Sequence, residues 1–242
     1  MGFLSKRKLR RLASRAKGLL LGRKDHQHPF DVQHGTDTSG VIAGASLGAG
    51  GESDQHITAY AGVPPSRMLA ALEIWTQQIG DRPVSDFAFF DLGCGKGRSL
   101  LLGSQLPFRS ALGVELDADL AKIAQRNAAL WTSAGKAACA IRAEQGDATK
   151  VLYGEGPRLV FLYNPFGPPV MRIVLNALSA MGGETYIIYQ NEYDATPLQG
   201  DERLEQLFRN SLPMSDEDAV ADPVASPEDI TGIYRMRQPS LR

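Results

Sequence analysis

The sequence predicts an α/β fold: a doubly wound, mostly parallel sheet of seven strands, or slightly fewer, with helices on both faces. Two observations support this prediction. From residue 87 onward, short apolar runs alternate with stretches of helical periodicity, as expected when each strand is followed by a crossover helix. The runs themselves, such as FAFFDL at 87–92, are almost continuously apolar. Strands that are buried on both faces of a parallel sheet have this composition.

The elements of this sheet are expected in a regular order along the chain. A helix at 64–79 precedes the first strand. Strands are predicted at 87–92, 110–116, within 138–148, and at 158–164, 184–192 and 230–237. Helices are predicted at 98–106, 117–135 and 168–182, and one more near 199–209. The order strand, helix, strand favours parallel pairing with right-handed crossovers.

Composition places the chain among ordinary globular proteins. It has 242 residues, of which 43% are hydrophobic and 22% charged, enough for one domain with appendages. The two cysteines, Cys94 and Cys139, do not make a disulfide framework, which favours a reducing compartment. No apolar run approaches the ~18 residues of a membrane span. We therefore expect a cytoplasmic protein, with peripheral contact to a membrane as a second option.

The charge is unevenly distributed and divides the chain into three parts. Residues 1–24 contain nine Lys or Arg and no acidic residue, whereas the rest holds 17 basic against 27 acidic residues. We interpret 1–24 as a basic arm: an amphipathic helix on anionic lipid, a nucleic-acid-binding arm, or a disordered tail. Residues 25–62 are rich in glycine and form either a linker or a lid over a ligand. The main domain is 63–242.

The stretch FFDLGCGKGRS at 89–99 carries the clearest sign of a ligand site. Asp91 ends a strand, and Gly93, Gly95 and Gly97 follow at alternate positions. Glycine allows a sharp turn and lets a ligand contact the main chain. The third glycine falls one place earlier than in the dinucleotide fingerprint, and Arg98 stands where that fingerprint requires a small residue. The loop therefore predicts a ligand without a pyrophosphate, with a plain strand-to-helix turn as the structural alternative.

Acidic residues follow the next two strands at the same expected edge of the sheet. Glu115 lies at the end of 110–116, where a carboxylate can accept both hydroxyl protons of a ribose. Asp147, in Gly146-Asp147-Ala148, can accept a hydrogen bond from an adenine amino group. Its alternative role is to cap a short helix at 149–153.

With these motifs in order, residues 87–192 resemble the Rossmann-like class I S-adenosylmethionine-dependent methyltransferases. DLGCGKG is similar to their first motif, VELD to their ribose-binding acidic motif and GDA to their adenine-side motif. The resemblance implies methyl transfer with S-adenosyl-L-methionine as the cofactor, and makes 63–242 the methyltransferase domain. It assigns the cofactor to Asp91, Gly93, Cys94, Gly95, Gly97, Glu115, Leu116, Asp147, Ala148 and Asn164.

Asn164-Pro165-Phe166 stands at the end of strand 158–164, where this family places its substrate motif. Its amino-group methyltransferases often have Asp/Asn-Pro-Pro-Tyr/Phe there, and this chain lacks the second proline. The resemblance implies that the Asn164 side-chain carbonyl and the main-chain carbonyl of Tyr163 or Asn164 accept hydrogen bonds from a neutral amine. The lone pair of the amine then points at the methyl group, while Phe166 packs on the substrate. We therefore predict Asn164, Pro165 and Phe166 as the catalytic residues.

A nitrogen acceptor follows from this resemblance, and the missing proline argues against a nucleobase. A protein lysine amine is the first expectation, and a small-molecule or RNA nitrogen is the second. A non-catalytic cofactor-binding module, docked by the basic arm, is an alternative of a different class. The oligomeric state is left open.

The segment before the first strand has a further, weaker resemblance. YAGVPPSRMLAAL at 60–72 is similar to an entry segment of some Rossmann-type protein lysine methyltransferases, which also place a Thr-rich loop over the cofactor. DTSG at 37–40 is predicted to be that loop, with Asp37 and Thr38 at the carboxylate end of the ligand; a linker is the alternative. The four histidines, at 26, 28, 34 and 56, have no cysteine beside them, so we predict no metal site.

Overall fold

The computed structural model describes residues 27–192 and 197–237. The basic arm at 1–24 lies outside the described residues, so its proposed contact with a membrane or nucleic acid stays a prediction. Across the described residues, no helix combines the length and apolarity needed to cross a membrane.

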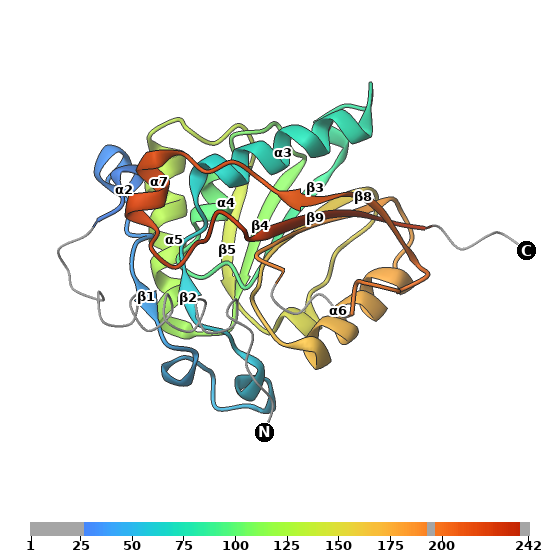
Figure 1. The fold of residues 1–242 in the computed structure, drawn as a ribbon, viewed down its shortest axis with the longest axis horizontal. Helices are drawn as coiled ribbons and strands as arrows, with labels where there is room; N and C mark the ends of the chain where they lie inside the picture. Colours follow the sequence, from blue (N-terminus) through green and yellow to red (C-terminus); the bar gives the residue numbers. More distant parts are fainter. Residues whose placement is uncertain (1–26, 193–196, 238–242) are drawn as a thin grey trace, which may run out of the picture.

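Within the described residues, seven strands form one sheet in the order β5-β4-β3-β6-β7-β9-β8 (Figure 1). Only β9 runs against the others, since it pairs antiparallel with both β7 and β8 while the remaining pairs are parallel. The predicted doubly wound, mostly parallel, Rossmann-like sheet is thus confirmed. The strands are β3 (Ala88–Leu92), β4 (Ser110–Glu115), β5 (Ile141–Gln145), β6 (Arg158–Tyr163), β7 (Thr185–Gln190), β8 (Leu204–Ser211) and β9 (Ile230–Met236).

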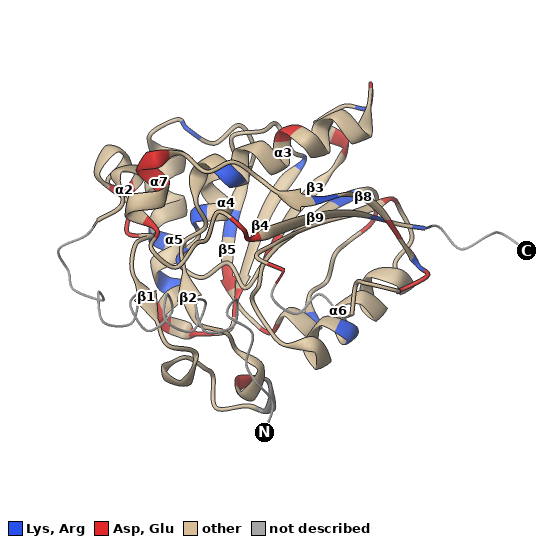
Figure 2. Ribbon diagram, viewed as in Figure 1, with Lys and Arg blue, Asp and Glu red and all other residues tan. Residues whose placement is uncertain are grey.

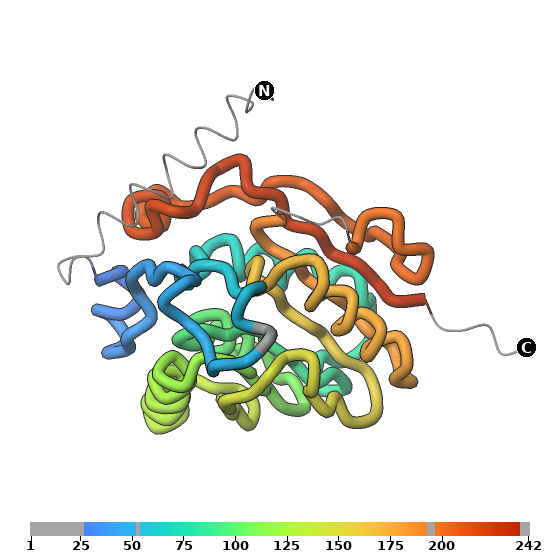
Figure 3. The backbone as a smooth tube through the Cα atoms, turned by 90° about the horizontal axis from the view of Figure 1, so that it is seen from below, coloured from blue at the N-terminus to red at the C-terminus, as the bar shows by residue number. Residues whose placement is uncertain are grey.

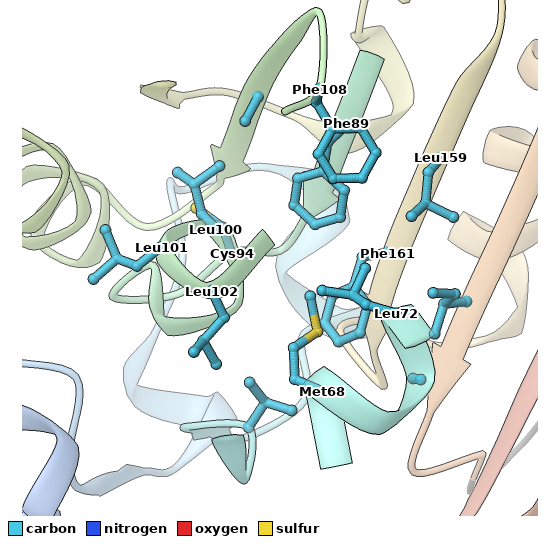
Figure 4. Close-up of a cluster of buried hydrophobic side chains, with 14 of the residues drawn as sticks. Met68, Leu72, Phe89, Cys94, Leu100, Leu101, Leu102, Phe108, Leu159 and Phe161 are labelled. Atoms are coloured by element: carbon cyan, nitrogen blue, oxygen red, sulfur yellow. The ribbon is translucent and has the colours of Figure 1, made fainter. Parts of the chain in front are cut away.

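Each face of the sheet carries its own core, because successive strand residues point to opposite sides. In β3, Phe89 joins the core under α3 (Pro65–Ile79), α4 (Arg98–Gly103) and α5 (Ala118–Ser133), which Figure 4 shows in part. Phe90, its neighbour, faces the core under α6 (Pro168–Ala180). Helices therefore cover both faces, as predicted, and the carboxyl ends of the parallel strands are left to form a site.

The helix predicted near 199–209 is wrong, because these residues enter the edge strand β8. Leu204, Leu207 and Phe208 have the three- and four-residue spacing of a helix face. In the structure a bulge between Gln206 and Phe208 shifts the register against β9. A bulge inserts one residue and breaks the alternation of a strand. This allows Leu204 to face one core while Leu207 and Phe208 pack on the other.

The glycine-rich segment lies across the carboxyl ends of the strands (Figure 3). It contains α2 (Pro29–His34), the short antiparallel pair β1 (Val41–Ile42) and β2 (Tyr60–Ala61), and the 3-10 turn η2 (Glu52–His56). Ile57 forms an isolated antiparallel bridge with Phe166, just beyond β6. The N-terminal segment thus reaches the strand end where the substrate motif was predicted. A further short helix, α7 (Asp216–Ala221), lies beside α2 (Figure 1).

Candidate functional site

A cavity of about 840 Å³, counting its open mouth, lies at the carboxyl ends of the central strands. The neighbours of β3 are β4 on one side and β6 on the other, so the chain order reverses at this place, where open α/β sheets bind their ligands. The sheet contributes Gly93, Cys94, Gly95, Val114, Glu115, Leu116, Gly146, Asp147, Ala148, Tyr163, Pro165 and Phe166. The opposite wall is the continuous stretch 57–63, which we call the strap.

Gly93 and Gly95 form the floor of the cavity with backbone that other residues rarely adopt. Their φ angles are +73° and +55°. A Cβ on Gly93 would lie 2.4 Å from the Pro165 side chain, and one on Gly95 would lie 2.3 Å from the Tyr60 ring. Neither contact is compatible with an L side chain. The loop therefore presents bare main chain to the cavity, as a ligand that binds against the backbone requires.

Glu115 lies beside this loop and holds it in place. One carboxylate oxygen accepts from the Gly95 amide at 2.8 Å, and the other accepts from the Asp117 amide at 2.9 Å. Burial raises the pKa of Glu115, while these main-chain hydrogen bonds oppose the rise. A carboxylate oxygen has more than one lone pair, so both oxygens can still accept from a ligand hydroxyl in the cavity.

Asp147 both caps a turn and lines the cavity. One of its side-chain oxygens accepts from the Thr149 amide at 2.9 Å and from the Thr149 hydroxyl at 2.7 Å, so it caps the 3-10 turn η4 (Ala148–Lys150). It also lines the cavity, together with Leu116 and Ala148. The cap fixes the carboxylate at the wall where an adenine was predicted.

Asp91 and Gly97 lie behind the cavity wall, not in it. Asp91 is buried and accepts from the Ser99 hydroxyl at 2.6 Å; Ser99 is the residue that lines the cavity. Burial raises the pKa of Asp91 to about 7, against the opposing effect of that hydrogen bond. A Cβ on Gly97 would lie 3.3 Å from Ala124 of α5, so this glycine serves the close packing of α4 on α5.

Of the predicted catalytic residues, Pro165 and Phe166 line the cavity and Asn164 does not. Asn164 has a φ of +44° and is largely buried. Its main-chain oxygen accepts from the Thr58 hydroxyl at 2.5 Å, and its side-chain oxygen accepts from the Tyr189 hydroxyl at 3.2 Å. Tyr163, of which the sequence predicted only a main-chain contact with the amine, also lines the cavity beside them.

Thr38, predicted to reach the cofactor, is also outside the lining residues. Its amide and hydroxyl donate to the buried Asp31 at 2.9 and 2.7 Å, and its hydroxyl accepts from Arg98 Nε at 2.8 Å. Its main-chain oxygen accepts from Tyr60 at 2.7 Å. The polar groups of Thr38 therefore position the strap and the start of α4.

Asp37, like Thr38, is not among the residues that line the cavity, and it contacts the glycine loop. Its carboxylate lies 2.7 Å from Lys96 Nζ, and its amide donates to the buried Asn127 at 3.0 Å. Asn127 in turn donates to the main-chain oxygen of Lys96 at 2.9 Å. Asp37 and the main-chain oxygen of Ser39 thus both hold the Lys96 side chain of the glycine loop. No sequence signal predicted these partners, which lie 59 and 90 residues away in the chain.

His28, Asp218 and Asp222 form a buried cluster with metal-ligand chemistry. His28 Nε2 lies 3.3 Å from Asp218 and 3.2 Å from Asp222, and Nδ1 accepts from the Phe30 amide at 3.0 Å. Burial lowers the pKa of His28, but its hydrogen bonds to Asp218 and Asp222 outweigh this effect and raise the pKa to about 9. Arg98 Nη1 also bonds both oxygens of Asp222, at 2.9 and 3.0 Å. The cluster is thus an ion network that ties α7, which is rich in acidic residues (Figure 2), to α4.

A comparison with protein-family models finds no match, and none of the curated proteins matches. Solved structures with a similar fold include the YcgJ protein of Bacillus subtilis, 12% identical over 71% of this chain and 100% of that one, with a TM-score of 0.49. Another is the ribosomal protein L11 methylase of Lactobacillus delbrueckii subsp. bulgaricus, 13% identical over 70% and 78%, with a TM-score of 0.44. A third is an RNA methyltransferase of Salinibacter ruber in complex with S-adenosyl-L-homocysteine, 16% identical over 71% and 92%, with a TM-score of 0.43. Likeness at this level concerns the fold alone.

Proposed function

We propose that this protein is an S-adenosylmethionine-dependent methyltransferase that acts on a nitrogen acceptor. The observation that carries the proposal is the floor of the cavity. Gly93 and Gly95 present main chain that no Cβ could cover, and Glu115 and Asp147 stand beside them at the same edge. This is the order of contacts that a methionine group, a ribose and an adenine would need along the three strand ends.

The residues present fit this cofactor in kind. The bare backbone at Gly93 and Gly95 would hold the methionine part, Glu115 would accept from the ribose hydroxyls, and Asp147 would lie on the adenine side. Leu116 and Ala148 supply apolar contact for the base. S-adenosylmethionine supplies an electrophilic methyl group on a sulfonium, with a neutral thioether as the leaving group.

The chain's own part is to position the acceptor and to keep it neutral. In the transfer a nitrogen–carbon bond forms, the carbon–sulfur bond breaks, and its electron pair stays on sulfur. The methylated nitrogen then releases a proton to water if it held one. Among the described lining residues, the ionisable side chains are Tyr60, Cys94, Arg98, Glu115, Asp147 and Tyr163. Glu115 and Asp147 are assigned to the cofactor and none of the others is a histidine or lysine, so the acceptor would enter without its proton, which the apolar part of the wall favours.

A protein lysine amine is the acceptor that we favour. The strap contacts the substrate motif directly, with the Thr58 amide 3.4 Å from the Pro165 oxygen and Ile57 bridged to Phe166. A flat base would have to separate these two main chains, whereas a slender alkylamine has a narrower path to cross. A small-molecule amine has the same chemistry, and an RNA nitrogen is the second alternative.

The first test is calorimetric titration of the full chain with S-adenosyl-L-methionine. We expect one site, and at least a tenfold loss of affinity in Glu115→Ala, because two amide donors lose their acceptor and the ribose loses its partner. Asp119→Ala, which removes an exposed carboxylate at the start of α5, is the matched control. No binding to the unaltered chain would contradict the proposal.

The acceptor is tested by incubating the protein with methyl-labelled cofactor and a cell lysate that is then separated into protein, RNA and small-molecule fractions. We expect label in protein, on lysine after hydrolysis. Label in RNA would contradict the lysine assignment and keep the methyltransferase. Cofactor binding without transfer to any fraction would favour the non-catalytic module.

A further inference from the structure

We propose that the Tyr163 hydroxyl, and not Asn164, is the polar group that contacts the acceptor nitrogen. The inference rests on the proposed function. Three residues at the end of β6 line the cavity, namely Tyr163, Pro165 and Phe166. Of their side chains only Tyr163 carries a polar atom. A nitrogen placed at this wall therefore meets one side chain that can form a hydrogen bond.

Asn164 has its oxygens directed to other partners. Its main-chain oxygen accepts from the strap through Thr58, and its side-chain oxygen accepts from Tyr189 on β7. Asn164 also has a left-handed backbone, with a φ of +44°, and it is not among the residues that line the cavity. Both observations agree with oxygens that point away from the cavity. The role of Asn164 in the structure is to join the strap and β7 to the substrate motif.

Tyr163, in contrast, has its ring fixed and its hydroxyl available. The ring packs against the core under α3 and α4. Within the part of the chain that the structure describes, the hydroxyl forms no hydrogen bond. Burial raises the pKa of Tyr163, and the nearby charges of Asp229 and Asp222 are opposed by those of Arg67 and Arg98. The hydroxyl is therefore neutral at physiological pH, so its oxygen can accept from an N–H.

This contact would give the acceptor its direction. When one N–H of a neutral amine donates to Tyr163, the lone pair is turned away from the hydroxyl and toward the cofactor side of the cavity, over Gly93 and Gly95. Apolar side chains surround the same space, among them Ile57, Val63 and Val170. They disfavour an ammonium ion and admit the free amine. Orientation of this kind accounts for much of the rate of a displacement.

The test compares two ligands that differ where the methyl group would be. S-adenosyl-L-homocysteine has nothing there, whereas sinefungin carries an amino group that can donate to Tyr163. We expect the full chain to bind sinefungin more tightly through its uncharged amino group. Tyr163→Phe should lose about tenfold in sinefungin affinity, as for the loss of one hydrogen bond, with S-adenosyl-L-homocysteine changed less than about twofold. Tyr153→Phe is the control, because the hydroxyl of the buried Tyr153 also has no hydrogen-bond partner among the described residues, whereas Tyr153 lies outside the cavity lining.

Several results would overturn the assignment. These are equal affinity of the unaltered chain for both ligands, an unchanged sinefungin affinity in Tyr163→Phe, or loss of the preference in Asn164→Ala instead. Failure of the unaltered chain to bind S-adenosyl-L-homocysteine would overturn the proposed function itself. Thermal unfolding of each variant separates loss of the contact from loss of the fold, and Tyr163→Leu repeats the test if the phenylalanine variant is unstable.

Discussion

The two walls of the cavity are built in different ways. On the sheet side, Glu115 is the last residue of β4, and Gly93, Gly95 and Asp147 follow the ends of β3 and β5 within three residues, so local sequence places them. On the other side the strap is held by hydrogen bonds to distant parts of the chain, such as Thr58 to Asn164 and Tyr60 to Thr38. Sequence motifs therefore predict the residues of the sheet side, whereas the position of the strap depends on tertiary contacts. The variants below test whether the two walls are as independent as this difference implies.

Arg98 is the residue at which the two walls meet, and its loss should have the largest effect. Its guanidinium donates to Thr38, to the Val63 oxygen and to Asp222, and it is almost completely buried. Arg98→Met leaves the Asp222 carboxylate buried beside Asp218, which should lower the free energy of unfolding by about 4 kcal/mol. Denaturant titration measures this. Arg142→Met, at an exposed arginine, is the control.

A second substitution distinguishes the two roles of Arg98, which are to neutralise the Asp222 carboxylate and to hold Thr38 and Val63 in position. Adding Asp222→Asn to Arg98→Met removes the carboxylate that has lost its arginine partner and should restore part of the stability. The bonds that hold Thr38 and Val63 remain absent, so cofactor affinity should stay low in the double variant. Recovery of both stability and affinity would show that Arg98 has no positioning role in the cavity.

Asp91 gives the sheet side a dependence on pH. Its folded pKa of about 7 lies above that of an exposed aspartate because the carboxyl is buried. Between pH 4 and 7 the unfolded chain has therefore lost a proton that the folded chain keeps, so the contribution of Asp91 to stability falls as pH rises and levels off above 7. Relative to Asp91→Asn, whose side chain does not titrate, the parent should lose up to about 4 kcal/mol over this window. Denaturant titrations of both proteins at pH 4 to 8 measure this difference, and a constant difference would contradict the raised pKa.

Gly95→Val tests the floor of the cavity directly. Valine would need a φ of +55° and would place its Cβ against the Tyr60 ring of the strap. We expect a loss of cofactor affinity of about a hundredfold, or about 3 kcal/mol, by calorimetry. Gly135→Ala is the control, since Gly135 also has a positive φ but a Cβ there would meet no atom within 4 Å. It should lose stability without losing affinity.

The sequence was sufficient for most of the sheet and insufficient for the parts that break regular spacing. The apolar runs at 87–92 and 158–164 became β3 and β6 with their ends shifted by no more than one residue. The bulge in β8 gave that strand the spacing of a helix, so periodicity alone predicted the wrong element. Helix α7 is short and acidic, and its buried residue is Asp218, an aspartate and not an apolar residue. The partners of Asp218, His28 and Ser66, are far away in the chain, so no local pattern predicts this helix.

The candidate site divides in the same way. Glycines at 93 and 95 and the acids at 115 and 147 reach the cavity because a strand end fixes the residues that follow it. Thr38 was placed by analogy at the cofactor, yet its partner is Arg98, 60 residues later. Such a pairing cannot be read from spacing. For the same reason the sequence pointed to Asn164, whereas the structure has its neighbour Tyr163, and not Asn164, among the residues that line the cavity.

The smallest predicted effect concerns the contact that closes the strap on the substrate motif. Thr58→Val keeps the shape of the side chain and removes the hydroxyl that donates to Asn164. One lost hydrogen bond to a main-chain oxygen costs about 1 kcal/mol. Since the same bond holds the strap closed, its loss should increase hydrogen exchange of amides 57–62 by about fivefold, with little change elsewhere. Cofactor affinity should change by less than about threefold, because the sheet wall is untouched. Thr76→Val, on the exposed side of α3, removes a hydroxyl that bonds only within its own helix and is the control. Faster exchange at Gly93–Gly97 as well would mean that the walls are coupled through Asn164 and that the sheet side does not form independently of the strap.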